Sequence, residues 1–303
     1  MTARARGIGV GRIARRVGSR TFVEVIYHRR MLRPAAGLLI LALALVALAC
    51  SGTSEPSTEV APAEASAATI PDVGPNTLSA DEVAEGWTLL FDGQTFDGWR
   101  GLGREEVPAG HWTIEDGAIK KIDSGVVPLA PDGQPLEGGD IMTVETYDDF
   151  ELRFQWKVAP GANSGIKYNV SEAMSIETPP AHAALGFEFQ VLDDDLHPDA
   201  LNGPNRTAGA LYDLLGPTDQ KLLRSVGEFN DSRIVFDGPR GEHWLNGVKV
   251  VEFDLESADF AAHYAASKYD PIPGFADRRA GHIVLQDHGN DVWFRDIKMR
   301  TLP

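Results

Sequence analysis

Cysteine and long apolar runs are nearly missing from this chain of 303 residues. Its one cysteine, Cys50, has no partner within the chain, so no internal disulfide framework holds the fold. The apolar run at residues 35–49 is too short to span a bilayer unaided. The chain also lacks a Gly-x-Ser-x-Gly elbow, a P-loop and a dinucleotide fingerprint, so acyl transfer, nucleotide hydrolysis and hydride transfer have no motif support. A His-Glu-x-x-His pattern is absent too, and a catalytic zinc therefore lacks its usual signature.

Positive charge is scarce beyond the N-terminus. The chain carries 28 lysines and arginines against 44 aspartates and glutamates, a formal net charge of −16. Residues 1–49 hold nine arginines and one glutamate, so the net charge of residues 50–303 is −24. An acidic domain without a basic stripe argues against nucleic acid as a partner, and it favours a neutral substrate over a polyanion.

The N-terminal residues are typical of an export signal. Met31 lies within a short arginine-rich segment, the apolar run 35–49 follows, and small residues precede Cys50. Ala47-Leu-Ala-Cys50 resembles a bacterial lipobox, which predicts a lipid on Cys50 and a position at the cell envelope, either periplasmic or at the outer surface. Ordinary signal cleavage beside an incidental cysteine is the alternative.

Three regions follow from this pattern. Residues 1–49 are an N-terminal extension with a lipoprotein signal peptide. Residues 50–76 are rich in Ser, Thr, Ala, Pro and Glu, and they predict a flexible tether. Residues 77–303 are long enough for one domain with a sizeable core.

Short strands separated by Gly, Pro and Asn turns dominate residues 77–303. Apolar residues at every second position of 150–158 predict a half-buried antiparallel strand. Asn246-Gly247 between two strand-like segments predicts a hairpin, whereas Ser79-Ala-Asp-Glu82 matches a capping box and predicts a short helix. A second helix is expected within 256–269. Because strands and helices do not alternate, the expected fold is an all-β sandwich of two antiparallel sheets with one or two short helices.

The segment 281–300 predicts two strands around the turn 288–291. Alternation places Gln286 and His288 on one face, where a strand that only packs a core needs neither an amide nor an imidazole. In the predicted strand 186–193, Glu188 and Gln190 likewise share the face opposite the aromatic residues. Taken one at a time, each of these residues has an ordinary explanation: His288 as a turn histidine, and the others as solvated strand residues. The two pairs together indicate a site.

Further polar residues accompany these pairs. Asn163 and Lys167 come from a predicted break at 160–165 and from the strand after it. Carboxylates and amides on a concave β face suit carbohydrate, because amides bind hydroxyls and an acid or base moves a proton. The acidic run 193–195 with His197 offers oxygen ligands for calcium, although such a run is more often a solvated loop.

Several motifs in order resemble the 3-keto-disaccharide hydrolase domain family, which has a concanavalin A-like jelly-roll fold and is common in secreted bacterial proteins. The resemblance covers residues 83–302. Its motifs are Gly86-Trp-Thr-Leu-Leu-Phe-Asp-Gly93 with Asp97-Gly-Trp99, Asp149-Phe-Glu-Leu-Arg153, Pro160-Gly-Ala-Asn-Ser-Gly-Ile166, Gly186-Phe-Glu-Phe-Gln-Val-Leu-Asp193, Thr207-Ala-Gly-Ala-Leu-Tyr212, Leu245-Asn-Gly247 and the segment 281–297, with Gln286-Asp-His-Gly289 the most specific.

The resemblance implies a substrate oxidised at C3 of a hexose, cleaved through removal of the C2 proton, elimination and hydration. His288 or Glu188 would be the catalytic base. The substrate-binding residues would be Gln190, Gln286, Asn163, Lys167 and Asp287. For Asp287 the alternatives are that it orients His288 or simply caps the turn. No redox cofactor is implied, because a separate sugar 3-oxidoreductase would supply the keto sugar.

Two other functions fit the same sequence. A non-catalytic carbohydrate-binding module on a lipid tether would have the same fold, since fold does not determine function. A scaffold domain of a larger envelope complex would show no dependence on sugar.

Overall fold

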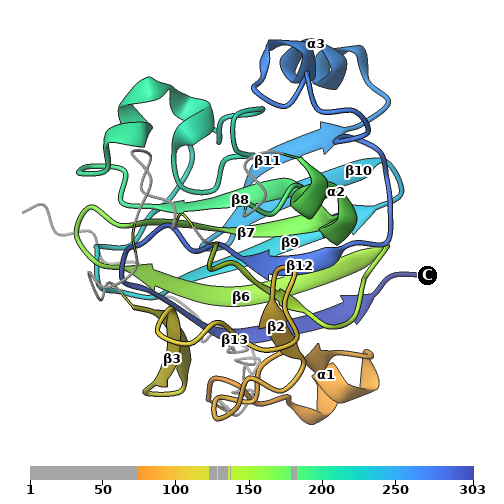
Figure 1. Ribbon diagram of the computed structural model, residues 1–303. Coiled ribbons are helices and arrows are strands. Elements are labelled where there is room, and N and C mark those ends of the chain that lie inside the picture. Colours follow the sequence, from red (N-terminus) through yellow and green to blue (C-terminus); the bar gives the residue numbers. More distant parts are fainter. Residues whose placement is uncertain (1–73, 123–127, 129–135, 137, 179–182) are drawn as a thin grey trace, which may run out of the picture. The chain divides into compact units, whose positions relative to one another are not determined.

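Two antiparallel β-sheets carry most of the described chain (Figure 1). The computed structural model describes residues 74–122, 128, 136, 138–178 and 183–303. In this part of the chain the larger sheet has eight strands, in the order β11–β10–β9–β6–β13–β4–β3 with β1 beside β13, and the smaller has five, in the order β2–β5–β12–β7–β8. The strands are β1 (Thr88–Leu89), β2 (Trp99–Gly101), β3 (Trp112–Glu115), β4 (Ala118–Lys121), β5 (Ile141–Thr143), β6 (Phe150–Val158), β7 (Asn163–Val170), β8 (Phe187–Leu192), β9 (Asn230–Asp237), β10 (Arg240–Leu245), β11 (Val248–Asp254), β12 (His282–Leu285) and β13 (Val292–Thr301). The predicted all-β sandwich of two antiparallel sheets is confirmed.

Local sequence explains the hairpins of the larger sheet. Asp116-Gly117 joins β3 to β4 and Asn246-Gly247 joins β10 to β11, with positive φ at all four residues. Two consecutive positive φ angles define the tight turn that matches the twist of paired strands, and Asn, Asp and Gly tolerate them best.

Helices are more numerous than the one or two that the sequence predicts. The described residues form three α-helices, α1 (Ala80–Ala84), α2 (Glu172–Glu177) and α3 (Ala258–Ala266), and two 3₁₀ turns, η1 (Pro198–Asn202) and η2 (Pro204–Arg206). The predicted capping box is present: Ser79 Oγ accepts the Glu82 N–H, and the Glu82 carboxylate accepts the Ser79 N–H. Among these described helices, none is long and apolar enough to cross a membrane. The predicted signal, Cys50 and nearly all of the tether lie outside the described residues.

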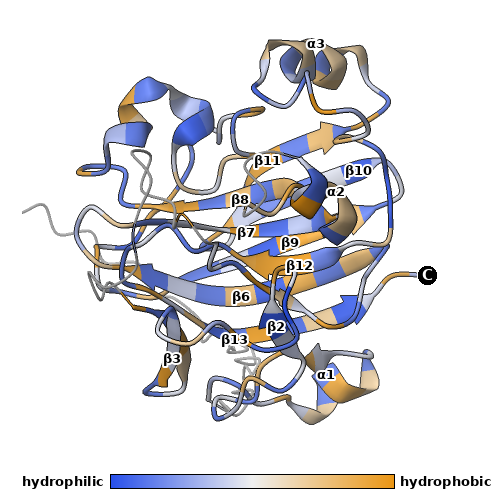
Figure 2. Ribbon diagram, in the orientation of Figure 1, coloured by the Kyte–Doolittle hydropathy of each residue, from blue (hydrophilic) through white to orange (hydrophobic). Residues whose placement is uncertain are grey.

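Aromatic side chains fill the space between the sheets. Tyr168 and Phe187 of the smaller sheet pack against Phe150 and Phe236 of the larger one, with ring centroids 5.3–6.1 Å apart in edge-on pairs. Such pairs contribute beyond their buried area. Figure 2 shows the resulting alternation of hydrophobic and hydrophilic residues along the strands.

Two predicted elements differ from the structure. β7 already begins at Asn163, so the predicted break ends earlier and Asn163 belongs to a strand. The predicted strands around 288–291 are β12 and β13, but they lie in different sheets. The turn between them therefore passes from the smaller sheet to the larger, and β12 ends at Leu285, just before Gln286.

Candidate active site

One face of the smaller sheet, directed away from the aromatic core, gathers the polar residues selected from the sequence. In the pairing of β7 with β8, Lys167 lies opposite Glu188 and Gly165 lies opposite Gln190. On the other side of β7, the Gln286 N–H donates to the Gly165 carbonyl at 3.0 Å. Because directly paired residues point to the same side of a sheet, the side chains of Glu188, Gln190, Lys167 and Gln286 share one face.

Gly165 leaves space for the Glu188 carboxyl group. A Cβ atom at position 165 would lie 2.4 Å from Glu188 Oε1 and 2.8 Å from its Cγ. The Glu188 side chain therefore lies directly over the backbone of Gly165, in the row that also contains Gln190 and Gln286. A larger residue at 165 would displace the carboxyl group.

The surroundings of Glu188 raise its affinity for a proton. Glu188 is 4 % exposed, and its Oε2 atom lies 3.8 Å from Lys167 Nζ. Burial raises the pKa of Glu188, Lys167 and Lys268 partly oppose this rise, and Asp140 and Asp199 add to it. A carboxyl group with a raised pKa beside an ammonium can accept and return a proton.

Two amides flank Glu188. With its nitrogen facing Glu188, the Gln190 amide donates to Glu188 Oε1 at 3.0 Å and to the Ser164 carbonyl at 3.1 Å. Ser164 Oγ donates to the Gln286 carbonyl at 2.6 Å, which holds the chain just beyond β12. Within the described residues the buried Gln286 Oε1 has no hydrogen-bond partner. It is thus an acceptor suited to a ligand hydroxyl.

His288 is half-buried and lies in the turn that follows β12. Its ring meets the ring of His197 edge-on, with centroids 5.8 Å apart and an interplanar angle of 82°. Burial lowers the pKa of His197. Asn290 in the same turn accepts the Asn163 N–H at 3.1 Å, so the turn is tied to the start of β7.

Asp287 requires a correction to its predicted role in substrate binding. Its carboxylate has no exposed surface: Oδ2 lies 2.6 Å from His111 Nδ1, and Oδ1 lies 3.2 Å from Lys121 Nζ. Oδ1 also accepts the Gly289 N–H at 2.9 Å. Because these partners occupy both oxygens, Asp287 shapes the turn beside His288 instead of facing the site.

The sequence patterns did not predict a cluster of polar side chains beside Glu188, which consists of Asp199, Arg206, Tyr212 and Lys268. The Tyr212 hydroxyl donates to Asp199 at 2.8 Å, and Arg206 donates to the Tyr212 oxygen at 2.8 Å and to Asp199 at 3.2 Å. Lys268 Nζ lies 4.4 Å from the centre of the Tyr212 ring, and burial raises the pKa of Tyr212. Tyr212 ends one of the family motifs quoted above, so that motif was a usable signal, whereas no local pattern marks Lys268.

The acidic run 193–195 bonds to the protein instead of converging on one point. Asp193 accepts the Gly161 N–H at 2.7 Å, while Asp194 accepts the Ala208 N–H at 2.8 Å and the Lys221 ammonium at 2.6 Å. In the part of the chain that the structure describes, no three His, Cys, Asp or Glu side chains are arranged to hold a metal ion. The predicted calcium site lacks the convergent oxygens that this ion requires.

Fold and site together define a concanavalin A-like jelly-roll sandwich whose smaller sheet carries a buried carboxyl group, Glu188, with two amides in the same row. Residues 86–300 match the 3-keto-alpha-glucoside-1,2-lyase-like domain. The chain belongs to this family, and the resemblance inferred from its motifs is confirmed.

Relatives agree with this assignment. The chain is 37 % identical over 237 residues to a 3-keto-disaccharide hydrolase of Bacteroides thetaiotaomicron, covering 72 % of this chain and 79 % of that protein. Two crystal structures from Parabacteroides distasonis, provisionally described as glycosyl hydrolases, are also similar. One is 30 % identical with a TM-score of 0.66, covering 76 % of this chain and 100 % of the other. The second is 26 % identical with a TM-score of 0.51, covering 71 % and 99 %.

Proposed function

We propose that this protein cleaves 3-keto-glycosides or 3-keto-disaccharides by elimination across C1 and C2 followed by hydration. Membership of the family and the name of the Bacteroides relative support the substrate class. The observation that carries the mechanism is the buried Glu188 carboxyl group, over Gly165 and 3.8 Å from Lys167 Nζ. The substrate must be a sugar already oxidised at C3.

The ketone makes this chemistry possible. It acidifies the C2 proton, so a base removes that proton and the C2–H electron pair forms an enolate with oxygen at C3. When the ketone re-forms, a C1=C2 double bond develops and the C1–O bond breaks. The leaving oxygen takes a proton, and water then adds hydroxide to C1 and a proton to C2. Net hydrolysis therefore needs one acid–base pair and enolate stabilisation, without two carboxylates flanking an oxocarbenium ion.

We assign Glu188 as the base, because its raised pKa suits proton abstraction next to a ketone. His288, from the turn that follows β12, would protonate the leaving oxygen. The Lys167 ammonium stabilises the enolate oxygen through its charge. The amides of Gln190, Gln286 and Asn163 would bind sugar hydroxyls, with the Gln286 Oε1 atom accepting one of them.

The cellular setting is part of the same proposal. The chain would be exported and anchored at the envelope through a lipid on Cys50, with residues 50–76 as the tether. A separate oxidoreductase must supply the C3 ketone, because the proposed steps involve no net oxidation. The reaction needs no redox cofactor.

The test compares turnover of 3-keto-trehalose and a chromogenic 3-keto-glucoside with that of the unoxidised glucosides. Glu188→Gln should lower kcat at least 1,000-fold and His288→Ala about 100-fold, within the range for acid–base groups. Glu151→Gln removes an equally buried carboxylate from the larger sheet, and His263→Ala removes a partly exposed imidazole from α3. Both controls should keep most of the activity, and EDTA treatment tests whether an ion contributes.

Binding of unoxidised glycans without turnover of either keto sugar would refute the enzymatic proposal. It would favour the tethered carbohydrate-binding module instead. Equal losses in Glu188→Gln and Glu151→Gln would refute the assigned site, because they would reflect damaged folding.

A further inference from the structure

A buried carboxylate outside the predicted site, Asp140, connects two distant segments of the chain. Asp140 lies just before β5 and is 3 % exposed. Its Oδ2 atom accepts the Ala184 N–H at 3.0 Å, and its Oδ1 atom accepts the Asp287 N–H at 2.8 Å. These two donors lie 44 and 147 residues away along the chain.

The first segment leads to Glu188. Ala184 shortly precedes β8, the strand that carries Glu188. The Ala184 carbonyl accepts a hydrogen bond from Lys167 Nζ at 3.0 Å, and the same ammonium lies 3.8 Å from Glu188 Oε2. Ala184 thus binds Asp140 through its N–H and, through its carbonyl, the cation beside Glu188.

The second segment leads to His288. Asp287 directly precedes it, and its carboxylate is held by His111 and Lys121 at 2.6 and 3.2 Å. Asp140 fixes the main chain of the same residue. The backbone beside His288 is therefore held from two sides.

We propose that Asp140 is a positioning residue that sets the distance between Glu188 and His288 by holding both segments with one carboxylate. This inference rests on the proposed function. Only a carboxylate offers two acceptor oxygens here, because an asparagine at this position would turn an NH₂ group towards one of the two N–H donors. A displacement of about 1 Å between an acid and a base costs roughly 100-fold in rate.

Asp140→Asn in the full chain tests the proposal, with Asp149→Asn as the matched control. Asp149 also accepts a backbone N–H, from Gly238 at 2.6 Å, and it binds Arg278 rather than any residue of the site. Hydrogen exchange followed by mass spectrometry measures whether each segment is held. Asp140→Asn should speed exchange about 10-fold in peptides containing Ala184 and in those containing Asp287, whereas Asp149→Asn should affect only peptides near Gly238.

Kinetics on the keto sugar then separate positioning from general damage. Asp140→Asn should lower kcat about 100-fold with less than a 3-fold change in KM, and Asp149→Asn should change neither by more than 3-fold.

The acidic limb of the kcat/KM profile adds a second readout. The titratable groups that interact electrostatically with Glu188 are Lys167 from β7, Lys268 beyond α3, Asp199 from η1, Asp140, Tyr212 and Tyr269. Asp140 adds to the raised pKa of Glu188, and burial also raises the pKa of Asp140 itself, so Asp140→Asn should move the limb to lower pH wherever Asp140 is ionised.

The possible outcomes distinguish the positioning role of Asp140 from the proposed function of the protein. Unchanged exchange in either segment, or increased exchange with unchanged kcat, would overturn the positioning role. A wild-type chain that fails to turn over keto sugars would instead refute the proposed function, while the exchange data would still decide whether Asp140 joins the segments. If Asp140→Asn does not fold, Asp140→Ser keeps one short acceptor, and the same criteria apply to it.

Discussion

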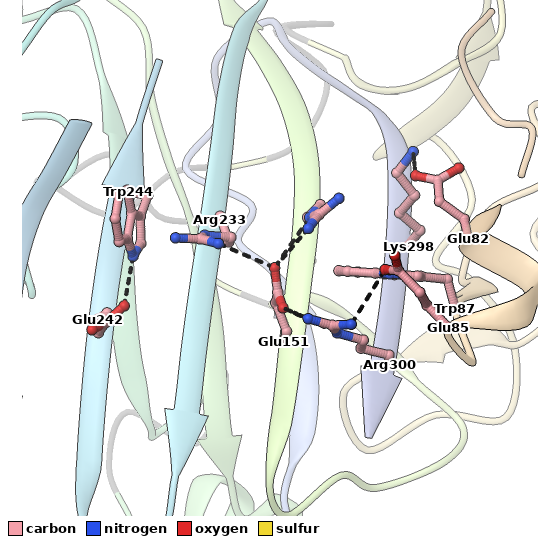
Figure 3. A network of polar contacts seen from close by, with 10 residues as sticks. Glu82, Glu85, Trp87, Glu151, Arg233, Glu242, Trp244, Lys298 and Arg300 are labelled. Carbon is pink, nitrogen blue, oxygen red and sulfur yellow. Dashed lines mark hydrogen bonds and ion pairs between the residues drawn. The ribbon is translucent and has the colours of Figure 1, made fainter. Parts of the chain in front are cut away.

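Replacing Glu151 with glutamine should destabilise the larger sheet by about 2–3 kcal/mol. Glu151 lies on β6, and the outward alternation of that strand predicts an exposed residue, yet Glu151 is 4 % exposed. Three guanidinium groups cover it: Arg153 at 3.0 Å, Arg233 at 3.4 Å and Arg300 at 2.6 Å. Figure 3 shows Arg233 and Arg300 converging on this carboxylate from the neighbouring strands.

The size of this loss in stability follows from the interactions that remain after Glu151→Gln. An amide keeps one acceptor but directs NH₂ towards Arg300 and removes the negative charge that the three arginines share. Breaking a fully buried ion pair costs about 3–5 kcal/mol. Because Arg153, Arg233 and Arg300 are 38, 31 and 29 % exposed, solvent screening reduces the loss to about 2–3 kcal/mol. For a domain of this size the melting temperature should fall by roughly 5–10 °C.

Thermal and urea unfolding of the wild type, Glu151→Gln and Glu242→Gln measure this effect. Glu242 also accepts from a cation, Lys249, but its side chain is 28 % exposed, so its loss should cost less than about 1 kcal/mol.

The hydrogen bonds from Arg300 and Arg153 keep the pKa of Glu151 below its ordinary value despite its burial. A lowered pKa in the folded state means that this stabilisation is present at neutral pH and is lost as the pH falls through that pKa. The reasoning would be refuted if Glu151→Gln and Glu242→Gln lost the same free energy of unfolding. It would also be refuted if the stability of Glu151→Gln fell with acid pH as it does in the wild type.

Two further predictions concern buried positions. Gly165→Ala should lower kcat at least 10-fold on keto sugars, because the new Cβ would displace the Glu188 carboxyl group; wild-type kinetics in the folded variant would show that this group can move freely. Burial lowers the pKa of His243 to about 4, and its ring bonds the Tyr168 hydroxyl and the Gly209 carbonyl. An unfolded histidine titrates near 6.5, so only the unfolded state gains a proton as the pH falls from about 6.5 to 4, and stability should drop by about 3 kcal/mol over that window. Urea unfolding across this range should show a steeper loss in the wild type than in His243→Gln, and equal slopes would contradict the assignment.

Local sequence was sufficient for most strands and for the candidate face. Strict alternation in Phe150–Val158 predicts β6 with its observed bounds, and Asn246-Gly247 predicts the β10–β11 hairpin. Alternation also places Glu188 with Gln190, because side chains two residues apart share a face where the backbone is extended. β12 ends at Leu285, so a shared face for Gln286 and His288 stays a prediction. These inferences needed no knowledge of strand order.

Only the tertiary structure decided which of these polar residues meet. β7 lies between β8 and β12, so its Gly165 brings Glu188, Gln190 and Gln286 into one row. Strand order depends on long-range packing, which a local pattern cannot encode. The same packing buries Asp287 with His111 and Lys121, which lie more than 160 residues earlier in the chain, and it lets Asp140 reach two segments that no sequence spacing connects. Periodicity thus determined the face on which each side chain lies, and the burial of that face determined the partners and the pKa of Glu188.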